Sequence, residues 1–256
     1  MKASDSWPLP FWIAHRGAGK LAPENTLAAF RTGAAHGYRA FECDVKLSAD
    51  GVPFLLHDTT LNRTTTERGV AGERHWTELS RIDAGNWHSR AFAGEPLPSL
   101  QSISQFVQRN GFALNLEIKP TPGQEAVTGA AVGAACLALW GAQPERLLLS
   151  SFEVEALRAA RDAAPAIPRA LLVDKLFANW FETARELECL AVVTNVALMD
   201  AALMAQLHGA GLRVLCYTVN DSSEVRRLLD LHIDGIITDA VDRFSPDATA
   251  VFDQLK

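Results

Sequence analysis

The sequence predicts an α/β protein with the fold of a (β/α)8 TIM barrel, and three observations lead to this expectation. Short β-branched or apolar runs alternate with Ala- and Leu-rich stretches through most of the chain. Eight such runs can be placed. The length of 256 residues matches the roughly 250 residues of a typical barrel. We therefore expect one barrel domain over 1–256, with a doubly wound open sheet as the alternative that the pattern leaves open.

The expected elements alternate along the chain. Asp221 to Glu224 resembles a capping box at a helix start, and Gly209 with Gly211 suits a helix end followed by a turn. The expected strands are 11–15, 40–46, 112–118, 146–150, 168–173, 190–194, 212–218 and 234–238. The expected helices are 25–37, 99–110, 124–140, 153–163, 179–188, 199–210, 221–231 and 242–255.

One segment interrupts this alternation. Residues 58–98 are rich in Thr, Gly, Arg and Trp and show no clear period. Connections this long inside a compact domain are usually functional or carry structure of their own. We expect a small insertion after the second strand that lies over one end of the barrel.

Composition excludes several classes of protein. The chain has 24 Lys and Arg against 30 Asp and Glu, a net charge of −6, and no basic run longer than a pair, so it lacks the clustered positive charge that nucleic-acid binding needs. The cysteines are far apart, without a CxxC pair or zinc spacing, so we expect buried free thiols. They are Cys43, Cys136, Cys189 and Cys216.

Two segments could indicate a secreted or membrane protein, and neither has the required pattern. Asp5, Pro8 and Pro10 interrupt the region where a signal peptide needs an unbroken apolar stretch, so we expect a cytoplasmic protein. Residues 126–144 carry no charge and contain Gly129 and Gly133 at GxxxG spacing. That segment is mostly Ala and Gly and slightly short for a bilayer, so we expect no membrane insertion.

Ionisable residues gather where the predicted strands end, which is the face of a parallel barrel where active sites form. Glu42 and Asp44 are alternate residues of the second strand and share a face, as do Glu117 and Lys119 of the third. If these faces point inward, three carboxylates converge and need a cation between them. Glu42, Asp44 and Glu117 thus predict a site for a hard divalent cation, although each could instead be a solvated strand-end charge or an ion-pair partner.

Two histidines also occur at these ends. His15 follows the first strand, and His57 closes a short extended run at 52–56. Because histidine exchanges protons near neutral pH, the pair could supply base and acid for displacement at a bound phosphate. We expect ordinary structural roles for the remaining histidines, which are His36, His75, His88, His208 and His232.

Two cations accompany them. Arg16 suits bidentate binding of phosphate oxygens, and Lys119 is a point charge that could bind the same group, with a salt bridge as the alternative for either. Residues 22–26 open the first helix, where Glu24 or Asn25 could contact the site, although we favour a capping role for them.

A series of motifs in these segments is similar to that of the glycerophosphodiester phosphodiesterase family. The match runs in order from about residue 11 to 240 and most resembles the short cytosolic bacterial branch associated with glycerol 3-phosphate uptake. The motifs are HRG at 15–17, APENT at 22–26, ECD at 42–44, DG at 50–51, LLHD at 55–58, LxRTT at 61–65, EPLP at 95–98, EIKP at 117–120, SSF at 150–152, YTVN at 217–220 and DGIITD at 234–239.

The resemblance implies a TIM barrel with an insertion and a metal-dependent hydrolase. Glycerophosphodiesters such as glycerophosphocholine and glycerophosphoethanolamine would give glycerol 3-phosphate and an alcohol, with one divalent cation, Mg²⁺ first and Ca²⁺ or Mn²⁺ as alternatives. It assigns metal binding to Glu42, Asp44 and Glu117, acid/base roles to His15 and His57, and phosphate binding to Arg16 and Lys119. Phe152 is a candidate pocket wall, with a plain core role as the alternative, and Tyr217, a smaller ring that could alter packing against the alcohol, stands where many members have Trp.

Other activities are compatible with these residues. A non-catalytic phosphodiester-binding barrel would keep the fold without the reaction. A lysophospholipase D would need an apolar groove, for which Trp76, Trp87 and Phe92 of the insertion are the candidates. The residues leave the nucleophile open between water and the neighbouring hydroxyl of the substrate glycerol, the latter through a cyclic phosphate. They do not indicate an oligomeric state.

Overall fold

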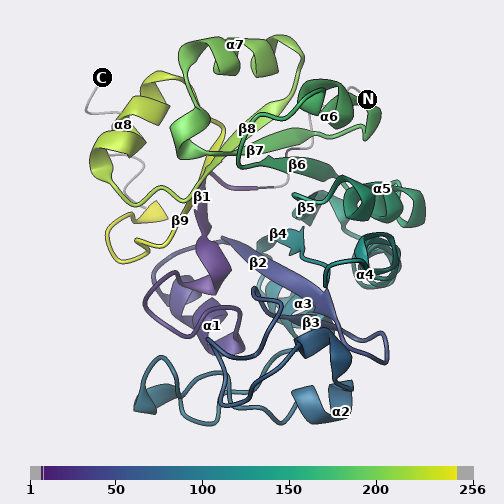
Figure 1. The fold of residues 1–256 in the computed structure, drawn as a ribbon. Coiled ribbons are helices and arrows are strands. Elements are labelled where there is room, and N and C mark those ends of the chain that lie inside the picture. The colour runs from purple at the N-terminus through teal and green to yellow at the C-terminus, as the bar shows by residue number, and fades with distance from the viewer. Residues whose placement is uncertain (1–6, 8, 247–256) are drawn as a thin grey trace.

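The computed structural model describes residues 7 and 9–246, and within them eight parallel strands form a closed barrel (Figure 1). β1 pairs with β9 on one side and, through Ala14 and Phe41, with β2 on the other. This closure confirms the predicted barrel and excludes the open sheet. The barrel strands are β1 (Trp12–Ala14), β2 (Ala40–Leu47), β4 (Ala113–Ile118), β5 (Leu147–Ser151), β6 (Arg169–Val173), β7 (Ala191–Asn195), β8 (Arg213–Tyr217) and β9 (Gly235–Thr238).

Helices surround the strands, and each observed barrel helix lies inside its predicted range (Figure 1). The helix expected at 242–255 falls largely outside the described residues. Asp221 caps its helix as predicted, by accepting a hydrogen bond from the backbone of Ser223. The helices are α1 (Leu27–Ala35), α2 (Trp76–Leu79), α3 (Leu100–Arg109), α4 (Glu125–Trp140), α5 (Val154–Ala163), α6 (Trp180–Glu186), α7 (Ala201–Gly209) and α8 (Ser222–Asp230).

Strand alternation divides the core into two layers. Trp12 and Ala14 point outward into the large apolar cluster beneath the helices, whereas Ile13 points into the barrel. The barrel interior is apolar, and many of its residues are small. Its buried residues are Leu9, Ile13, Ala40, Ala113, Leu148, Ala170, Leu172, Ala191, Val193, Leu215 and Ile237.

The insertion follows β3 (Pro53–Leu55), a short strand that pairs antiparallel with the end of β2. It contains α2 and two 3-10 turns, Ala71–Glu73 and Arg90–Phe92, before α3 begins. Apolar residues of β3 and of the insertion form a separate buried cluster that includes Phe54, Leu61 and Leu79. The insertion lies at the lower edge of the barrel in Figure 1, beside β2 and α1. It therefore has a small core of its own, as expected for an insertion of this length.

The GxxxG segment is part of α4 and packs tightly on α5. A side chain on Gly129 would collide with the carbonyl oxygen of Ala156, and one on Gly133 would lie 2.9 Å from that of Ala160. The spacing thus serves close helix packing within the barrel. Across the described part of the chain, every helix falls short of the length and apolar character that a membrane span requires. All four cysteines are free and buried, as predicted.

Candidate active site

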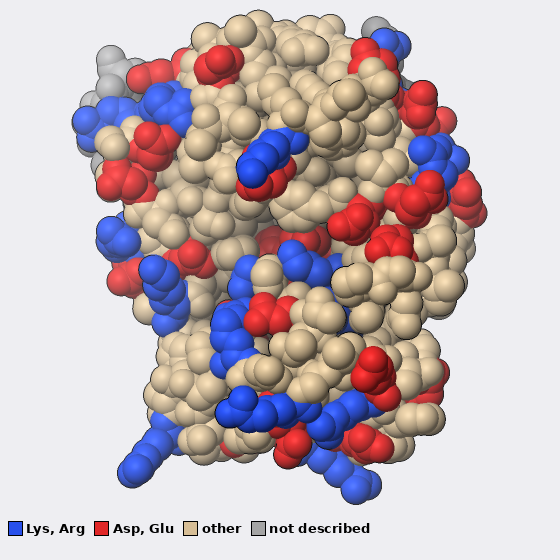
Figure 2. Space-filling view, viewed as in Figure 1, with Lys and Arg blue, Asp and Glu red and all other residues tan. Residues whose placement is uncertain are grey.

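A cavity of about 240 Å³ opens where the barrel strands end. The inward strand positions below it are apolar, and the next inward positions along the same strands are polar. Figure 2 shows a hollow near the middle of this face, with acidic and basic side chains together inside it. The lining residues are His15, Arg16, Glu42, His57, Asn115, Glu117, Lys119, Phe152, Leu172, Asp174, Tyr217, Thr218 and Ile237.

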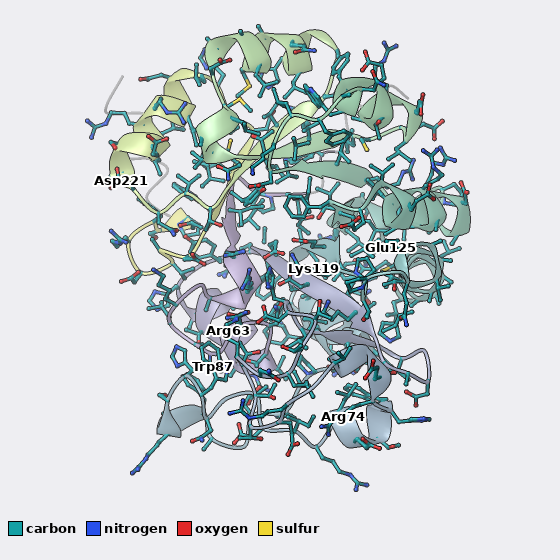
Figure 3. All side chains as sticks on the ribbon, viewed as in Figure 1. Arg63, Arg74, Trp87, Lys119, Glu125 and Asp221 are labelled. Carbon is teal, nitrogen blue, oxygen red and sulfur yellow. The ribbon has the colours of Figure 1, made fainter. Side chains whose placement is uncertain are left out.

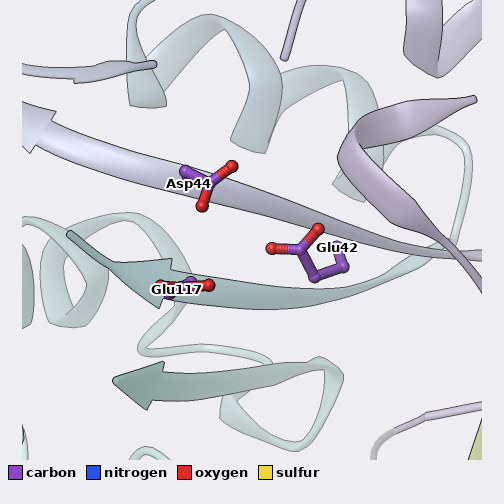
Figure 4. A group of neighbouring side chains, drawn as sticks. All are labelled: Glu42, Asp44 and Glu117. Atoms are coloured by element: carbon purple, nitrogen blue, oxygen red, sulfur yellow. The ribbon is translucent and has the colours of Figure 1, made fainter. Parts of the chain in front are cut away.

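Three carboxylates converge at this opening (Figure 4). Glu42 and Asp44 lie two residues apart on β2, and Asp44 is the register partner of Glu117 on β4. One oxygen from each lies within 4.8 Å of the others, and all three side chains are buried. An all-oxygen donor set of this charge fits a hard divalent cation. The structure therefore brings together the three predicted ligands.

The pKa values of the three carboxylates show that like charges are held close together in a buried place. Burial, followed by the charge of Asp44, raises the pKa of Glu42 to about 8. The same two causes raise the pKa of Glu117 to about 7. Burial also acts to raise the pKa of Asp44, but Arg16, His57, Lys119 and a hydrogen bond from Asn25 outweigh it and lower that pKa. Without a cation the cluster retains protons near neutral pH, which fits a site built for a counter-charge.

Arg16 follows β1 in a left-handed backbone conformation, with φ of 49°. Its backbone N–H donates to Glu42 at 3.0 Å, and its Nη1 donates to Glu24 at 2.9 Å. Its Nε is buried without a hydrogen-bond partner, 3.6 Å from an oxygen of Asp44. Strained backbone of this kind persists where surrounding contacts hold it, commonly at functional sites. The guanidinium is thus anchored at one end and keeps a donor unused beside the carboxylates.

His15 is held by residues at the ends of β8 and β9. Its Nδ1 lies 2.7 Å from Asp239, and Asn220 donates to the other oxygen of Asp239 at 3.1 Å. Gly19 lets the loop after β1 pass close to Asp239, since a side chain there would collide with the Asp239 backbone. Burial acts to lower the pKa of His15, but the Asp239 hydrogen bond and the charge of Glu42 outweigh it and raise that pKa.

His57 also lines this cavity. Its Nδ1 lies 2.8 Å from Asp58, whose carboxylate also accepts from Arg63 of the insertion. Burial, together with Arg16 and Lys119, lowers the pKa of His57 despite the opposing charge of Asp44. The structure therefore places both predicted histidines at one cavity, with a carboxylate on the Nδ1 of each.

Lys119 lines the cavity and lies near the middle of the molecule in Figure 3. Its Nζ donates to Glu117 at 2.9 Å and lies 5.5 Å from the centre of the Phe152 ring. The ring of Phe152 meets that of Tyr217 edge to face, with centroids 5.7 Å apart. All three predicted residues therefore line the cavity.

A second cavity of about 260 Å³ adjoins the first. His57, Glu117, Lys119 and Phe152 line both. The remainder of the second cavity is formed mainly by Lys46, Thr59, Pro120, Pro122, Glu125 and Glu153.

The capping role expected for Glu24 or Asn25 is wrong. Thr26 caps α1, by accepting a hydrogen bond from Ala29. Asn25 instead donates to Asp44 at 2.8 Å and accepts from the Asp44 backbone at 3.0 Å, and Glu24 binds Arg16. The same polar residue types suit a helix start and a binding site, so the sequence could not separate the two roles. The helix begins at Leu27, later than predicted and after both residues.

Sequence reasoning gave no role to several residues that hold the site together. Asp239 ends β9, Asn220 follows β8, and both support His15. Asp58 and Arg63 support His57 in the same way. Asp239 could have been found, because it stands at a strand end like the predicted ligands. The pairing of Arg63 had no local signal, since its partner Glu24 lies 39 residues away.

The other histidines and the aromatic residues of the insertion lie elsewhere. His208 pairs with Asp234, and His88 contacts the backbone of Lys20. Trp76 packs on Phe54 of the insertion core. Phe92 packs on a small cluster formed by Ala18, Ala22 and Ala29, so Trp87 is the exposed one of the three candidate groove residues.

Comparison with known proteins agrees with this geometry. Residues 15–243 match the glycerophosphoryl diester phosphodiesterase family. A glycerophosphodiester phosphodiesterase of Caldanaerobacter subterraneus is 30% identical over 231 residues, covering 89% of this chain and 93% of that protein. An Oleispira antarctica phosphodiesterase, solved with the product sn-glycerol-3-phosphate, is 33% identical with a TM-score of 0.86 and covers 96% of this chain and 97% of its own.

A Silicibacter pomeroyi protein described as a glycerophosphoryl diester phosphodiesterase gives a TM-score of 0.82 at 26% identity, over 96% of this chain and 94% of its own. The similarity spans nearly the whole barrel, including the segments that carry the cavity residues. The chain belongs to the glycerophosphoryl diester phosphodiesterase family of enzymes.

Proposed function

We propose that this enzyme hydrolyses glycerophosphodiesters of small alcohols, such as glycerophosphocholine and glycerophosphoethanolamine, to glycerol 3-phosphate and the alcohol. The observation that carries the proposal is the convergence of Glu42, Asp44 and Glu117 in one cavity with two histidines. The product held by the Oleispira antarctica phosphodiesterase supports the same chemistry.

Glu42, Asp44 and Glu117 would hold one divalent cation, Mg²⁺ in the first place and Ca²⁺ or Mn²⁺ as alternatives. Oxygen ligands in this number suit hard cations, and Mg²⁺ is commonly held by few carboxylates while its other ligands come from water and phosphate. When bound, the cation would neutralise negative charge on the phosphate and orient the diester.

Arg16 and Lys119 would bind the phosphate oxygens. Arg16 keeps its buried Nε unused, and the Lys119 ammonium has three donors of which Glu117 takes one. Arg16 and Lys119 stand beside the carboxylate cluster and now neutralise part of its charge. A phosphate bound between the two cations and the metal site would take over these ionic contacts. This placement supports anion binding in addition to the salt bridges themselves.

His15 and His57 would exchange protons with the substrate through Nε2. The carboxyl groups of Asp239 and Asp58 have lowered pKa values. For Asp239, burial acts to raise the pKa, but the hydrogen bond and charge of His15, together with Asn220 and Arg16, outweigh it. For Asp58, hydrogen bonds from Arg63 dominate. Both groups are therefore ionised acceptors, and each histidine Nδ1 must carry the proton that bridges to them. Nε2 of each ring is therefore the atom available to exchange a proton with a substrate in the cavity.

The two adjoining cavities favour a diester as substrate. They meet at His57, Glu117, Lys119 and Phe152, so a phosphate bound there has room on both sides for an ester group. Phe152 and Tyr217 would form an aromatic wall on one side. Small alcohols are favoured over acyl chains because the apolar cavity that Trp76 lines shares no lining residue with either of these two cavities, and Phe92 packs on the alanines after β1.

The test is direct assay of the purified protein. Glycerol 3-phosphate release should be seen with glycerophosphocholine and Mg²⁺, at a rate well above that with lysophosphatidylcholine. Preference for the lysolipid would replace the proposal with a lysophospholipase D. Tight binding of the diester without turnover would indicate a non-catalytic binding barrel.

A further inference from the structure

Arg63 of the insertion makes an unusually complete set of contacts. Its Nη1 and Nη2 donate to the two oxygens of Glu24 at 2.7 and 2.8 Å. Its Nε and Nη2 donate to the two oxygens of Asp58 at 2.8 and 2.9 Å. One guanidinium therefore makes paired hydrogen bonds with two carboxylates from different loops, one before α1 and one after β3. Figure 3 shows Arg63 between the α1 region and the insertion, below Lys119.

Each of these carboxylates holds a second group that faces the cavity. Glu24 accepts from Nη1 of Arg16 at 2.9 Å, and Asp58 lies 2.8 Å from Nδ1 of His57. The contacts thus run without a break from Arg16 through Glu24, Arg63 and Asp58 to His57. The two ends of this chain are the residues proposed to bind phosphate and to transfer a proton.

The contacts of Arg63 differ from those of an ordinary surface ion pair in burial and in number. The side chain of Arg63 is 44% exposed, and a single exposed pair would contribute little. Glu24 and Asp58 are more buried, at 12% and 27%, and each is bound by Arg63 through two hydrogen bonds. Paired arginine–carboxylate bonds fix orientation as well as distance. Lysine offers a single point charge and cannot reproduce this double fork.

We propose that Arg63 is a positioning residue that holds Arg16 and His57 in place together, so that the insertion sets one side of the active site. This inference rests on the proposed function, because it concerns how the diester is bound and cleaved. Arg63 acts through Glu24 and Asp58 and does not itself line the cavity. Its loss therefore combines two separable effects, one on phosphate binding and one on proton transfer.

The experiment compares R63A and R63K with E24Q and D58N in glycerophosphocholine hydrolysis. E24Q releases Arg16 and should mainly raise KM, whereas D58N releases His57 and should mainly lower kcat. R63A should do both, with kcat about 10- to 100-fold lower, the usual cost of losing a supporting partner of a site residue. R63K should remain close to R63A. The double variant R63A/D58N should lower kcat no further than the larger single effect.

Arg74 provides the matched control, since it is another insertion arginine that binds a backbone carbonyl and lies outside the cavity. R74A should keep wild-type kcat and KM. Added guanidinium at millimolar concentration should restore part of the R63A activity, a rescue that a merely structural role would not show. If R63A fails to fold, the changes in kcat and KM are measured in R63K instead, for which the same result is expected.

Wild-type KM and kcat in R63K, or additive losses in R63A/D58N, would overturn the proposal. Nitrogen NMR of the His57 ring keeps this test separate from the proposed function. The wild-type ring should hold its proton on Nδ1, and R63K should show a mixture of the two neutral forms. A wild-type protein without diesterase activity contradicts the proposed function, whereas an unchanged His57 tautomer in R63K contradicts the role of Arg63.

Discussion

The two histidines of the cavity have the same kind of partner but are supported by different parts of the molecule. His15 is held by Asp239 and Asn220, which stand at the ends of β9 and β8, and its side chain is 16% exposed. His57 is held by Asp58 and, through it, by Arg63 of the insertion, and its side chain is 28% exposed. The barrel therefore builds one side of the site, and the insertion completes the other.

The charges around the two rings differ as well. Burial acts to lower both pKa values, but carboxylates outweigh it at His15, whose pKa is raised. At His57, burial together with Arg16 and Lys119 outweighs the charge of Asp44 and the Asp58 hydrogen bond, so the pKa is lowered. The pKa values of the two rings are therefore shifted in opposite directions from the ordinary value of histidine. Such a contrast between two titratable groups is typical of a site that needs both an acid and a base.

The largest expected effect comes from removing a carboxylate of the metal site, which both sides of the cavity share. Replacing Glu42 by Ala should abolish diester hydrolysis, because the two remaining carboxylates no longer enclose a cation. Circular dichroism and thermal unfolding of the variant should show that the barrel is intact. Retention of a substantial part of the wild-type rate by a folded E42A would show that Glu42 is not a ligand.

Removing either ring should cost less than removing the metal site. His15→Ala and His57→Ala should each lower kcat by about 10²- to 10⁴-fold, the usual contribution of a positioned acid or base. His36→Ala is the control and should change kcat little, because His36 lies at the end of α1 away from the cavity. Equal sensitivity of His36 and His57 would contradict the assignment of the two rings.

The partners of the rings should separate the barrel side from the insertion side. Asp239→Asn should lower kcat more than Asp58→Asn, within the about 10- to 100-fold range expected for supporting residues. The reason is the exposure of the two rings: the His57 side chain is 28% exposed and the His15 side chain 16%, so water replaces a lost carboxylate contact more readily at His57. Steady-state kinetics of the two variants decides, and a larger loss in D58N would reverse the comparison.

The smallest expected effect is on the pH dependence of stability in the metal-free protein. The pKa of Glu42 rises from an ordinary 4.5 to about 8 on folding, so between these values the folded protein binds more protons than the unfolded chain. Stability of the metal-free protein should therefore fall as pH rises through this window. A cation displaces those protons, so its affinity should rise with pH. The increase in Tm given by Mg²⁺ should grow from pH 6 to pH 8, and a constant or shrinking increase would contradict the raised pKa.

Sequence reasoning predicted the barrel side of the molecule well and the insertion side poorly, for physical reasons. Strand period places Glu42, Asp44 and Glu117 on inward faces without knowledge of the fold, and the strand-end rule brings His15 to the same rim. The insertion has no period, and its key arginine pairs with a residue before α1. Contacts of that kind depend on the path of a loop, which local propensity does not determine.

The central claim is tested most directly by following glycerol 3-phosphate release from glycerophosphocholine with protein stripped by a chelator and then reloaded. The stripped protein should give no product, and Mg²⁺ should restore turnover, because the three buried carboxylates require a counter-charge before the site can bind an anionic diester. Full turnover in excess chelator would contradict the account.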